Sequence, residues 1–197
     1  MIAIIDSGGA NIASVQFALE RLGARSVLTR DAVEIAAADR VLLPGVGVAP
    51  VAMKALGAAQ LIEPIRQLRQ PVLGICLGMQ LLFGRSFEGG TDLLGILDGA
   101  CHAFTPSEAR SVPHMGWNRL HPTTTHPLLA GLDDVSHVYF VHSYYVPVND
   151  ATIATCNYGQ DFTAIAVRDN FLGCQFHPER SGQVGARILQ NFLEMPS

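Results

Sequence analysis

The chain has 197 residues and a formal net charge of −4 at pH 7; 49% of its residues are hydrophobic and 15% are charged. A chain of this length and apolar content can bury a sizeable core, so we expect one compact domain spanning residues 1–197 and exclude intrinsic disorder. The mildly acidic balance argues against a nucleic-acid binder, and the longest runs without Asp, Glu, Lys or Arg are shorter than the roughly 18 apolar residues of a membrane-spanning helix.

The first half of the chain alternates predicted strands and helices. The apolar run Ile2–Ile5 carries no basic residues, so we interpret it as a first strand and not as a signal peptide. Further strands are predicted at 26–29, 40–43 and 71–75. Helices are predicted at 11–22, with Gly23 as its C-cap, at 31–38, and at 51–68 with a break around Glu63 and Pro64. A loop at 44–47 follows the third strand.

The second half has a different pattern. Short segments that favour strands occupy residues 99–174, the stretch 105–112 is typical of a surface loop, and a helical pattern returns at 181–195. Strands that alternate with helices imply right-handed crossovers and a parallel sheet covered on both faces. We therefore predict an α/β fold: a doubly wound, mostly parallel sheet with helices on both faces and a short antiparallel β appendage.

The sharpest local motif is Gly74-Ile75-Cys76-Leu77-Gly78, which follows a buried strand and precedes a helical pattern. Small residues two positions either side of Cys76 allow the tight turn of a nucleophile elbow. Such a turn would place the thiol at the carboxyl end of a strand and at the N-terminus of a helix, which favours the thiolate. The alternative is a buried structural cysteine in a glycine-bordered turn.

A base for this nucleophile is offered by His177, which follows a predicted strand and lies two residues before Glu179. Glu179 would orient the imidazole, and His177 would exchange the proton. The alternative is an exposed histidine beside a helix-capping glutamate, and the spacing alone does not decide between them.

The loop at 44–47 has the sequence Pro-Gly-Val-Gly and also follows a strand. Its backbone N–H groups could stabilise a developing oxyanion, with the N–H of Leu77 as a second donor. An ordinary turn is the alternative. A phosphate-binding loop is less consistent, because the Lys-Ser/Thr pair of a P-loop is missing.

Neither a metal site nor a cofactor site is predicted. The pairs His121 and His126, and His137 and His142, are five residues apart, without an HExxH helix or clustered cysteine ligands. The four cysteines are scattered and form no CxxC pair, so we expect reduced thiols of a cytoplasmic protein.

Taken together, these residues resemble the class I (triad) glutamine amidotransferases, and within them the glutaminase subunits of imidazole glycerol phosphate synthase, an enzyme of histidine biosynthesis. The resemblance spans nearly the whole chain. It is carried by the segments DSGGAN (6–11), LPGVG (43–47), GICLGMQ (74–80), PHMGWN (113–118), YFVHSY (139–144) and QFHPERS (175–181). Segments 44–47 and 113–118 point to this subunit in particular.

The resemblance implies glutamine hydrolysis without a cofactor. Cys76 would attack the carboxamide and form a glutamyl thioester, His177 would protonate the departing ammonia and activate water, and Glu179 would orient His177. Candidate contacts for glutamine are Gln80, Ser143 and Tyr144. The family's oxyanion loop corresponds to Val46 and Gly47, with Leu77 as second donor. In this family the loop rearranges when the partner subunit triggers it. The chain alone would then have almost no glutaminase activity.

The resemblance also implies a partner, the (β/α)8-barrel cyclase subunit of a heterodimer. That subunit would use the ammonia to form imidazole glycerol phosphate and an aminoimidazole carboxamide ribonucleotide. The residues matching the family's interface positions are Met115, Trp117, Asn118 and Tyr139. An exposed apolar patch would be the physical signature of such an interface.

Three alternatives remain. A glutaminase subunit of another pathway, such as pyridoxal phosphate or p-aminobenzoate synthesis, is disfavoured by segment 113–118. A non-catalytic regulatory module of the same fold is disfavoured by the presence of Cys76, His177 and Glu179. A cysteine hydrolase or peptidase with the same elbow would act on esters or peptides without a partner.

Overall fold

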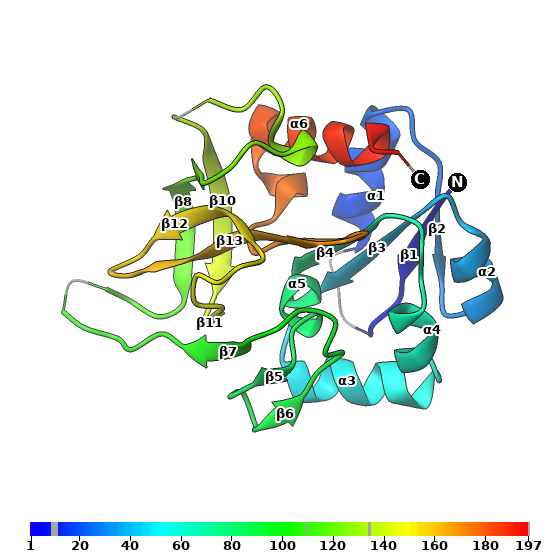
Figure 1. Ribbon diagram of the computed structural model, residues 1–197, viewed down its shortest axis with the longest axis horizontal. Coiled ribbons are helices and arrows are strands. Elements are labelled where there is room, and N and C mark those ends of the chain that lie inside the picture. The colour runs from blue at the N-terminus through cyan, green and yellow to red at the C-terminus, as the bar shows by residue number, and fades with distance from the viewer. Residues whose placement is uncertain (9–11, 109, 134, 197) are drawn as a thin grey trace.

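The computed structural model describes residues 1–8, 12–108, 110–133 and 135–196. Within these residues, eight strands form one sheet in the order β2-β1-β3-β4-β14-β13-β12-β9 (Figure 1). The first five run parallel, and the last three continue the sheet with antiparallel neighbours. The strands are β1 (Ile2–Ile5), β2 (Ser26–Thr29), β3 (Arg40–Gly45), β4 (Val72–Cys76), β9 (His121–Pro122), β12 (Thr152–Asn157), β13 (Asp161–Arg168) and β14 (Phe171–Cys174).

Two smaller sheets lie outside the main sheet, one beside its antiparallel end and the other reaching the helix at 49–58 (Figure 1). One is an antiparallel pair, and the other has the order β11-β7-β5-β6. The pair consists of β8 (His114–Arg119) and β10 (His137–His142). The second sheet consists of β5 (Arg85–Ser86), β6 (Thr91–Asp92), β7 (Ala100–Ala103) and β11 (Tyr144–Tyr145). Strands β7, β8, β10 and β11 and the antiparallel part of the main sheet form the predicted β appendage, whereas β5 and β6 precede the predicted segment and β5 pairs with β7 in parallel.

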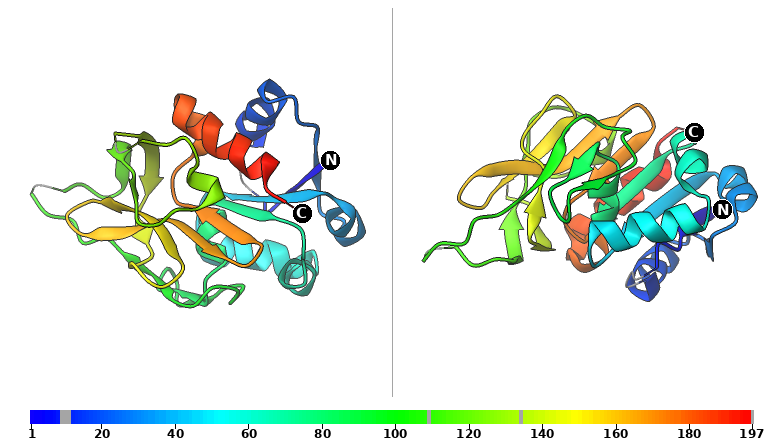
Figure 2. Two further views of the ribbon diagram at one scale, coloured as in Figure 1. Left: turned by 45° about the horizontal axis from the view of Figure 1, so that its top comes forward. Right: turned by 90° about the horizontal axis from the view of Figure 1, so that it is seen from below.

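Helices cover both faces of the parallel strands, as Figure 2 shows from above and below. The first face is covered by α1 (Ile12–Arg21) and α6 (Gly182–Glu194), and the second by α2 (Ala32–Ala37), α3 (Ala49–Ala58) and α4 (Ile62–Arg66). Short helices are α5 (Leu77–Leu81) and the 3-10 turns η1 (Pro127–Leu129) and η2 (Pro178–Arg180).

Burial of β1 explains why both faces need helices. Ile2 and Ile4 belong to one buried apolar cluster, whereas Ala3 and Ile5 belong to another. Successive side chains of a strand point to opposite faces, so a continuous apolar run requires cover on both sides. The predicted doubly wound fold is confirmed.

Two predicted boundaries are wrong. The strand predicted at 40–43 continues to Gly45, so Pro44 lies in β3 and not in a loop. Proline is tolerated there because β1 pairs with β3 only as far as Leu42, and the missing N–H faces no strand. The predicted helix at 51–68 is interrupted at residues 59–61, where Gln60 has a φ of 56°.

Pro64 does not break the helix, because it lies in the first turn of α4, where an N–H has no helical partner. The other ends agree closely with the prediction: α2 begins after Asp31, whose carboxylate caps Val33 and Glu34. The predicted helix start at Asn11 lies outside the described residues.

Strand pairing brings three sequence motifs to one edge of the sheet. Gly45 of β3 is paired with Cys76 of β4, and Ile75 of β4 is paired with Cys174 of β14. The segments that follow these three strands therefore emerge next to one another at the carboxyl edge, where open α/β sheets place their sites.

Candidate active site

Cys76 lies in a strained turn between β4 and α5. Its backbone has φ 55° and ψ −111°, a conformation that L-residues rarely adopt. The flanking glycines are required by contact: a Cβ on Gly74 would lie 2.6 Å from the Gly78 carbonyl oxygen, and one on Gly78 would lie 1.7 Å from that of Leu43. The predicted nucleophile elbow is therefore present in the backbone geometry.

His177 and Glu179 form a buried pair. The Nδ1 of His177 lies 2.8 Å from Oε1 of Glu179, and the side chains are 8% and 2% exposed. The backbone N–H of His177 donates to the Tyr139 carbonyl, and Ser181 donates its hydroxyl to the His177 carbonyl. These bonds fix the segment after β14 against β10. The alternative of an exposed histidine beside a capping glutamate is excluded.

The surroundings of His177 favour its protonated form, which is the charge state that can stabilise a neighbouring thiolate. Burial by itself lowers the pKa of His177. The neighbouring Cys76 and Glu179 side chains outweigh this effect and raise the pKa to about 10. Within the described residues, the buried side-chain nitrogen and oxygen atoms without a hydrogen-bond partner are Nε2 of His177 and Oε2 of Glu179. A protonated imidazole with a free Nε2–H can stabilise a thiolate and later deliver its proton.

A cavity of about 410 Å³ opens over this pair and the thiol. All the catalytic, oxyanion-loop and glutamine-contact residues predicted from the sequence line it: Val46, Gly47, Cys76, Leu77, Gln80, Ser143, Tyr144, His177 and Glu179. Its volume is within the range of small-ligand sites. The structure therefore brings together residues from four separate segments of the chain.

The predicted oxyanion loop lies directly beside the nucleophile, because Gly45 is paired with Cys76. Val46 is 40% exposed, and Gly47 has a φ of 93° with open space where a Cβ would stand. The role of the Val46, Gly47 and Leu77 N–H groups as oxyanion donors stays a prediction.

Internal hydrogen bonds limit what Gln80 can offer to a substrate. Its Nε2 donates to the Tyr144 carbonyl and to Oε1 of Gln175, both at 2.9 Å. Both amide hydrogens are thus used inside the protein, and only Oε1 remains to accept a hydrogen bond from a ligand.

Two cavity-side residues escaped the sequence analysis. Gln175 is fully buried, and its Nε2 approaches Sγ of Cys76 at 3.9 Å. Glu88 lines the cavity, and its Oε2 accepts the Ala49 N–H at 2.7 Å. Gln175 follows β14 directly and lies two residues before His177, and the local sequence gives no further sign of its role. Nothing in the local sequence marks Glu88.

The predicted interface residues fall on two faces of the sheet formed by β8 and β10. Met115 and Trp117 are 62% and 57% exposed, and Tyr139 is paired with Trp117, with ring centroids 6.0 Å apart. The Arg180 guanidinium lies over the Tyr139 ring. Asn118 lies on the opposite face, where its amide donates to the Asn157 carbonyl. Met115 and Trp117, with the half-buried Tyr139, therefore form an apolar patch on the surface, and Asn118 is not part of it.

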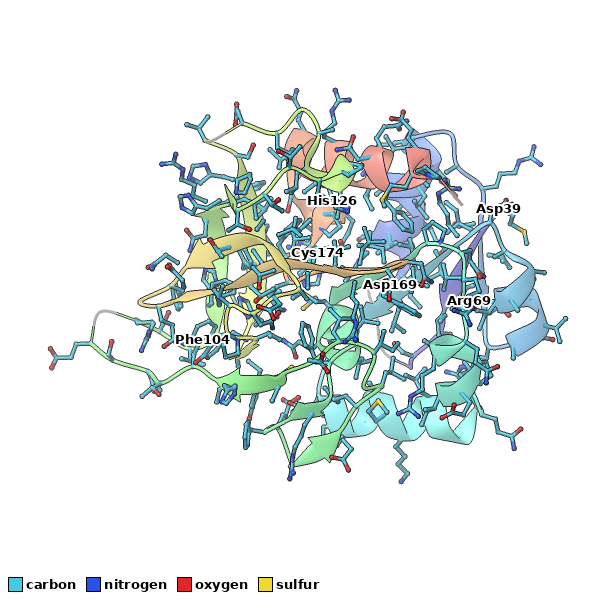
Figure 3. The ribbon with its side chains drawn as sticks, in the orientation of Figure 1. Asp39, Arg69, Phe104, His126, Asp169 and Cys174 are labelled. Atoms are coloured by element: carbon cyan, nitrogen blue, oxygen red, sulfur yellow. The ribbon has the colours of Figure 1, made fainter. Side chains whose placement is uncertain are left out.

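The other three cysteines are buried, and none of the four is bridged. Burial raises the pKa of Cys101 and of Cys156 to about 12, and it also raises the pKa of Cys174, which lies on β14 (Figure 3), well above its ordinary value. These three thiols are therefore poor nucleophiles at neutral pH. In the described part of the chain, no three His, Cys, Asp or Glu side chains gather as metal ligands, and no helix is long and apolar enough to cross a membrane.

A comparison with protein families matches residues 3–195 to "Glutamine amidotransferase class-I". The chain belongs to the class-I glutamine amidotransferase family. Solved structures of a glutamine amidotransferase and of PurLQS from Thermotoga maritima share the fold, with TM-scores of 0.75 and 0.70. Each covers 98% of this chain and at least 96% of its own, at 18% and 20% identity.

Curated relatives narrow the assignment. The imidazole glycerol phosphate synthase subunits HisH of Xanthomonas axonopodis pv. citri and of Xylella fastidiosa strain Temecula1 are each 53% identical to this chain over 194 residues. These alignments cover 98% of the chain and 97% of each relative. The predictions of a glutamine amidotransferase, and of the glutaminase subunit of imidazole glycerol phosphate synthase in histidine biosynthesis, are confirmed.

Proposed function

We propose that Cys76, His177 and Glu179 carry out glutamine hydrolysis in this amidotransferase. The Cys76 thiolate attacks the carboxamide carbon and forms a tetrahedral intermediate. This collapses to a glutamyl thioester as the C–N bond breaks, and His177 gives its proton to the departing ammonia. His177 then takes a proton from water, which attacks the thioester and releases glutamate and the Cys76 thiolate. The observation that carries this proposal is the buried 2.8 Å His177–Glu179 pair beside the elbow thiol.

The cavity also suits the charges of free glutamine. Among the residues that the structure describes, those lining the cavity outside the His177–Glu179 pair include one carboxylate, Glu88, and one guanidinium, Arg180. We assign Glu88 to the α-ammonium group, because one of its oxygens is already fixed by the Ala49 N–H and the other is left to accept. Oε1 of Gln80 and the backbone at Ser143 and Tyr144 complete the contacts.

We propose that the N–H groups of Val46 or Gly47 and of Leu77 stabilise the oxyanion of both tetrahedral intermediates. Removing one such donor typically costs about 10²–10³ in kcat. A loop with an exposed Val46 and an unrestricted Gly47 can change conformation without disturbing the sheet. A partner-triggered rearrangement of this loop would keep the isolated chain nearly inactive.

The partner we propose is the (β/α)8-barrel cyclase subunit, in a heterodimer located in the cytoplasm. Met115, Trp117 and Tyr139 form the contact surface, because exposed aromatic residues and methionine are enriched in protein interfaces. A sealed contact keeps ammonia away from water, where it would become ammonium and lose the lone pair that attacks.

The test combines the chain with the cyclase subunit and that subunit's nucleotide substrate, and it follows product formation with glutamine or with an ammonium salt. The wild-type complex uses both nitrogen sources. A complex with Cys76→Ala uses ammonium alone, and its subunits still associate. Glutamine-dependent turnover by the Cys76→Ala complex at the wild-type rate would contradict the proposed mechanism.

A further inference from the structure

A buried pair of histidines lies behind the wall of the glutamine cavity. His142 lines the cavity at the end of β10, and His114 stands opposite it on β8. Nε2 of His142 lies 2.9 Å from Nδ1 of His114, and Nδ1 of His142 lies 2.8 Å from the Tyr144 carbonyl oxygen. Nε2 of His114 lies 3.2 Å from the amide nitrogen of Asn118. These four residues form a continuous hydrogen-bonded row.

Each hydrogen bond in this row has one direction. The Tyr144 carbonyl only accepts, so Nδ1 of His142 carries a proton. Burial lowers the pKa of His142 to about 3 and that of His114 to about 4, so both rings are neutral at pH 7. Nε2 of His142 therefore accepts from Nδ1 of His114, whose own Nε2 accepts from Asn118. Both histidines are fixed in the Nδ1–H tautomer.

The row continues from Tyr144 to the nucleophile. The Tyr144 carbonyl also accepts from Nε2 of Gln80, and the same nitrogen donates to Oε1 of Gln175. Nε2 of Gln175 in turn approaches Sγ of Cys76 at 3.9 Å. A chain of polar contacts thus runs from β8 through the cavity wall to the thiol.

The surroundings of the pair are aromatic. His114 is stacked between Phe140 and Tyr158, with ring centroids 4.8 and 4.0 Å away, and Phe104 (Figure 3) contacts both imidazoles edge-on. Apolar rings would fill this space as well. Burying imidazoles costs free energy unless their nitrogens are paired, so their presence here indicates a requirement for directed hydrogen bonds.

We propose that His114 and His142 are positioning residues for glutamine hydrolysis. They hold the Tyr144 carbonyl in the cavity wall, and through it the Gln80 amide and the Gln175 amide, the second of which approaches the thiol. The inference rests on the proposed catalytic function of that thiol. Because β8 also carries the exposed apolar patch on its other face, the row links the proposed partner surface to the nucleophile.

The test compares His114→Phe with His114→Asn and a control. Phenylalanine keeps the ring stacking but removes both nitrogens. Asparagine places its Nδ2 where Nδ1 stands, so it can still donate to His142. The control is Phe104→Leu, which loosens the same aromatic cluster but removes no hydrogen-bonding group of the row. Each variant is assayed in complex with the cyclase subunit and its nucleotide ligand, and its Tm is measured.

We expect His114→Phe to lower kcat/KM for glutamine about tenfold, and His114→Asn to lower it about threefold or less. Phe104→Leu should lower Tm while leaving kcat/KM within about twofold of the wild type. A wild-type kcat/KM in His114→Phe, no recovery in His114→Asn, or an equal loss in Phe104→Leu would each overturn the positioning role.

A second readout does not depend on activity. Nitrogen-15 NMR of the folded chain distinguishes the protonated from the unprotonated nitrogen of each imidazole. We expect both His114 and His142 to be neutral with the proton on Nδ1 at pH 7. An Nε2–H tautomer or an imidazolium at either position would overturn the directed row. If instead the Cys76→Ala complex hydrolysed glutamine normally, the proposed function would be wrong. The NMR experiment would still test the direction of the hydrogen bonds in the row independently of that result.

Discussion

Gly45 and Cys76 are paired across β3 and β4, and this register joins two motifs that lie 31 positions apart in the sequence. The chain that follows Gly45 starts beside Cys76, so Val46 and Gly47 line the same cavity as its thiol. A shift of the pairing by one residue would turn Cys76 to the other face of the sheet. The register is therefore as important for the site as the residues themselves.

Gly78→Ala tests the elbow. A Cβ at this position would lie 1.7 Å from the Leu43 carbonyl oxygen, so β3 and α5 must separate. We expect unfolding to become easier by about 1–3 kcal/mol or more, with loss of glutaminase activity. Gly57→Ala in α3 is the matched control: its Cβ meets Ile62 at 3.7 Å, an ordinary contact, and alanine favours a helix. Denaturant unfolding checks both; equal stability of the two variants would contradict the contact argument.

Glu179→Gln tests the electrostatics of the His177 pair. The pKa of His177 is raised to about 10, above its usual 6.5, so the proton it binds stabilises the folded state fully below pH 6.5. That contribution is lost as pH rises towards 10. Glutamine at 179 removes the carboxylate, so we expect the pKa of His177 to fall, the stabilisation to become smaller, and its loss above pH 6.5 to be complete at a lower pH. Activity should fall less than in Cys76→Ala.

An NMR titration of the His177 ring checks this shift. Glu34→Gln, at the start of α2, is a matched control that removes a carboxylate from another face of the protein. An unchanged His177 pKa in Glu179→Gln would show that the carboxylate does not hold the imidazolium.

Trp117→Ala tests the proposed contact surface. The side chain is 57% exposed, so its removal should change the free energy of unfolding little. We expect glutamine-dependent synthesis by the complex to fall, while ammonium-dependent synthesis persists, because the change affects transfer and activation and not the cyclase chemistry. Val33→Ala is a control at another exposed apolar position, 78% exposed on α2. Equal losses with both nitrogen sources would show that Trp117 does not act in coupling.

Much of the fold follows from local patterns. The continuous apolar run of β1 and the stripe of α1 predict buried strands and surface helices, because those periods report directly on burial. The motif around Cys76 was recognisable because its two glycines are forced by backbone contact with Leu43 and with each other. Strand ends also predicted where the motifs meet, since parallel strands share a carboxyl edge.

Other features depend on long-range contacts that no local pattern encodes. Pro44 could be placed in β3 only by knowing that β1 ends its pairing at Leu42. The function of Gln175 depends on contacts with Gln80 and Cys76, nearly a hundred positions away. The position of Asn118 on the inner face of β8 follows from the alternation of the strand, which was predicted only as a short β segment.

The central claim is that Cys76 is the nucleophile, and covalent labelling tests it most directly. A diazoketone analogue of glutamine binds in the glutamine site and alkylates the cysteine thiolate that lies there. After treatment of the partner-bound protein, peptide mass spectrometry should find the label on Cys76 and on none of Cys101, Cys156 and Cys174. Glutaminase activity should fall in proportion to the fraction of Cys76 that is labelled. Activity lost without modification of Cys76, or a label on another cysteine, would contradict the account.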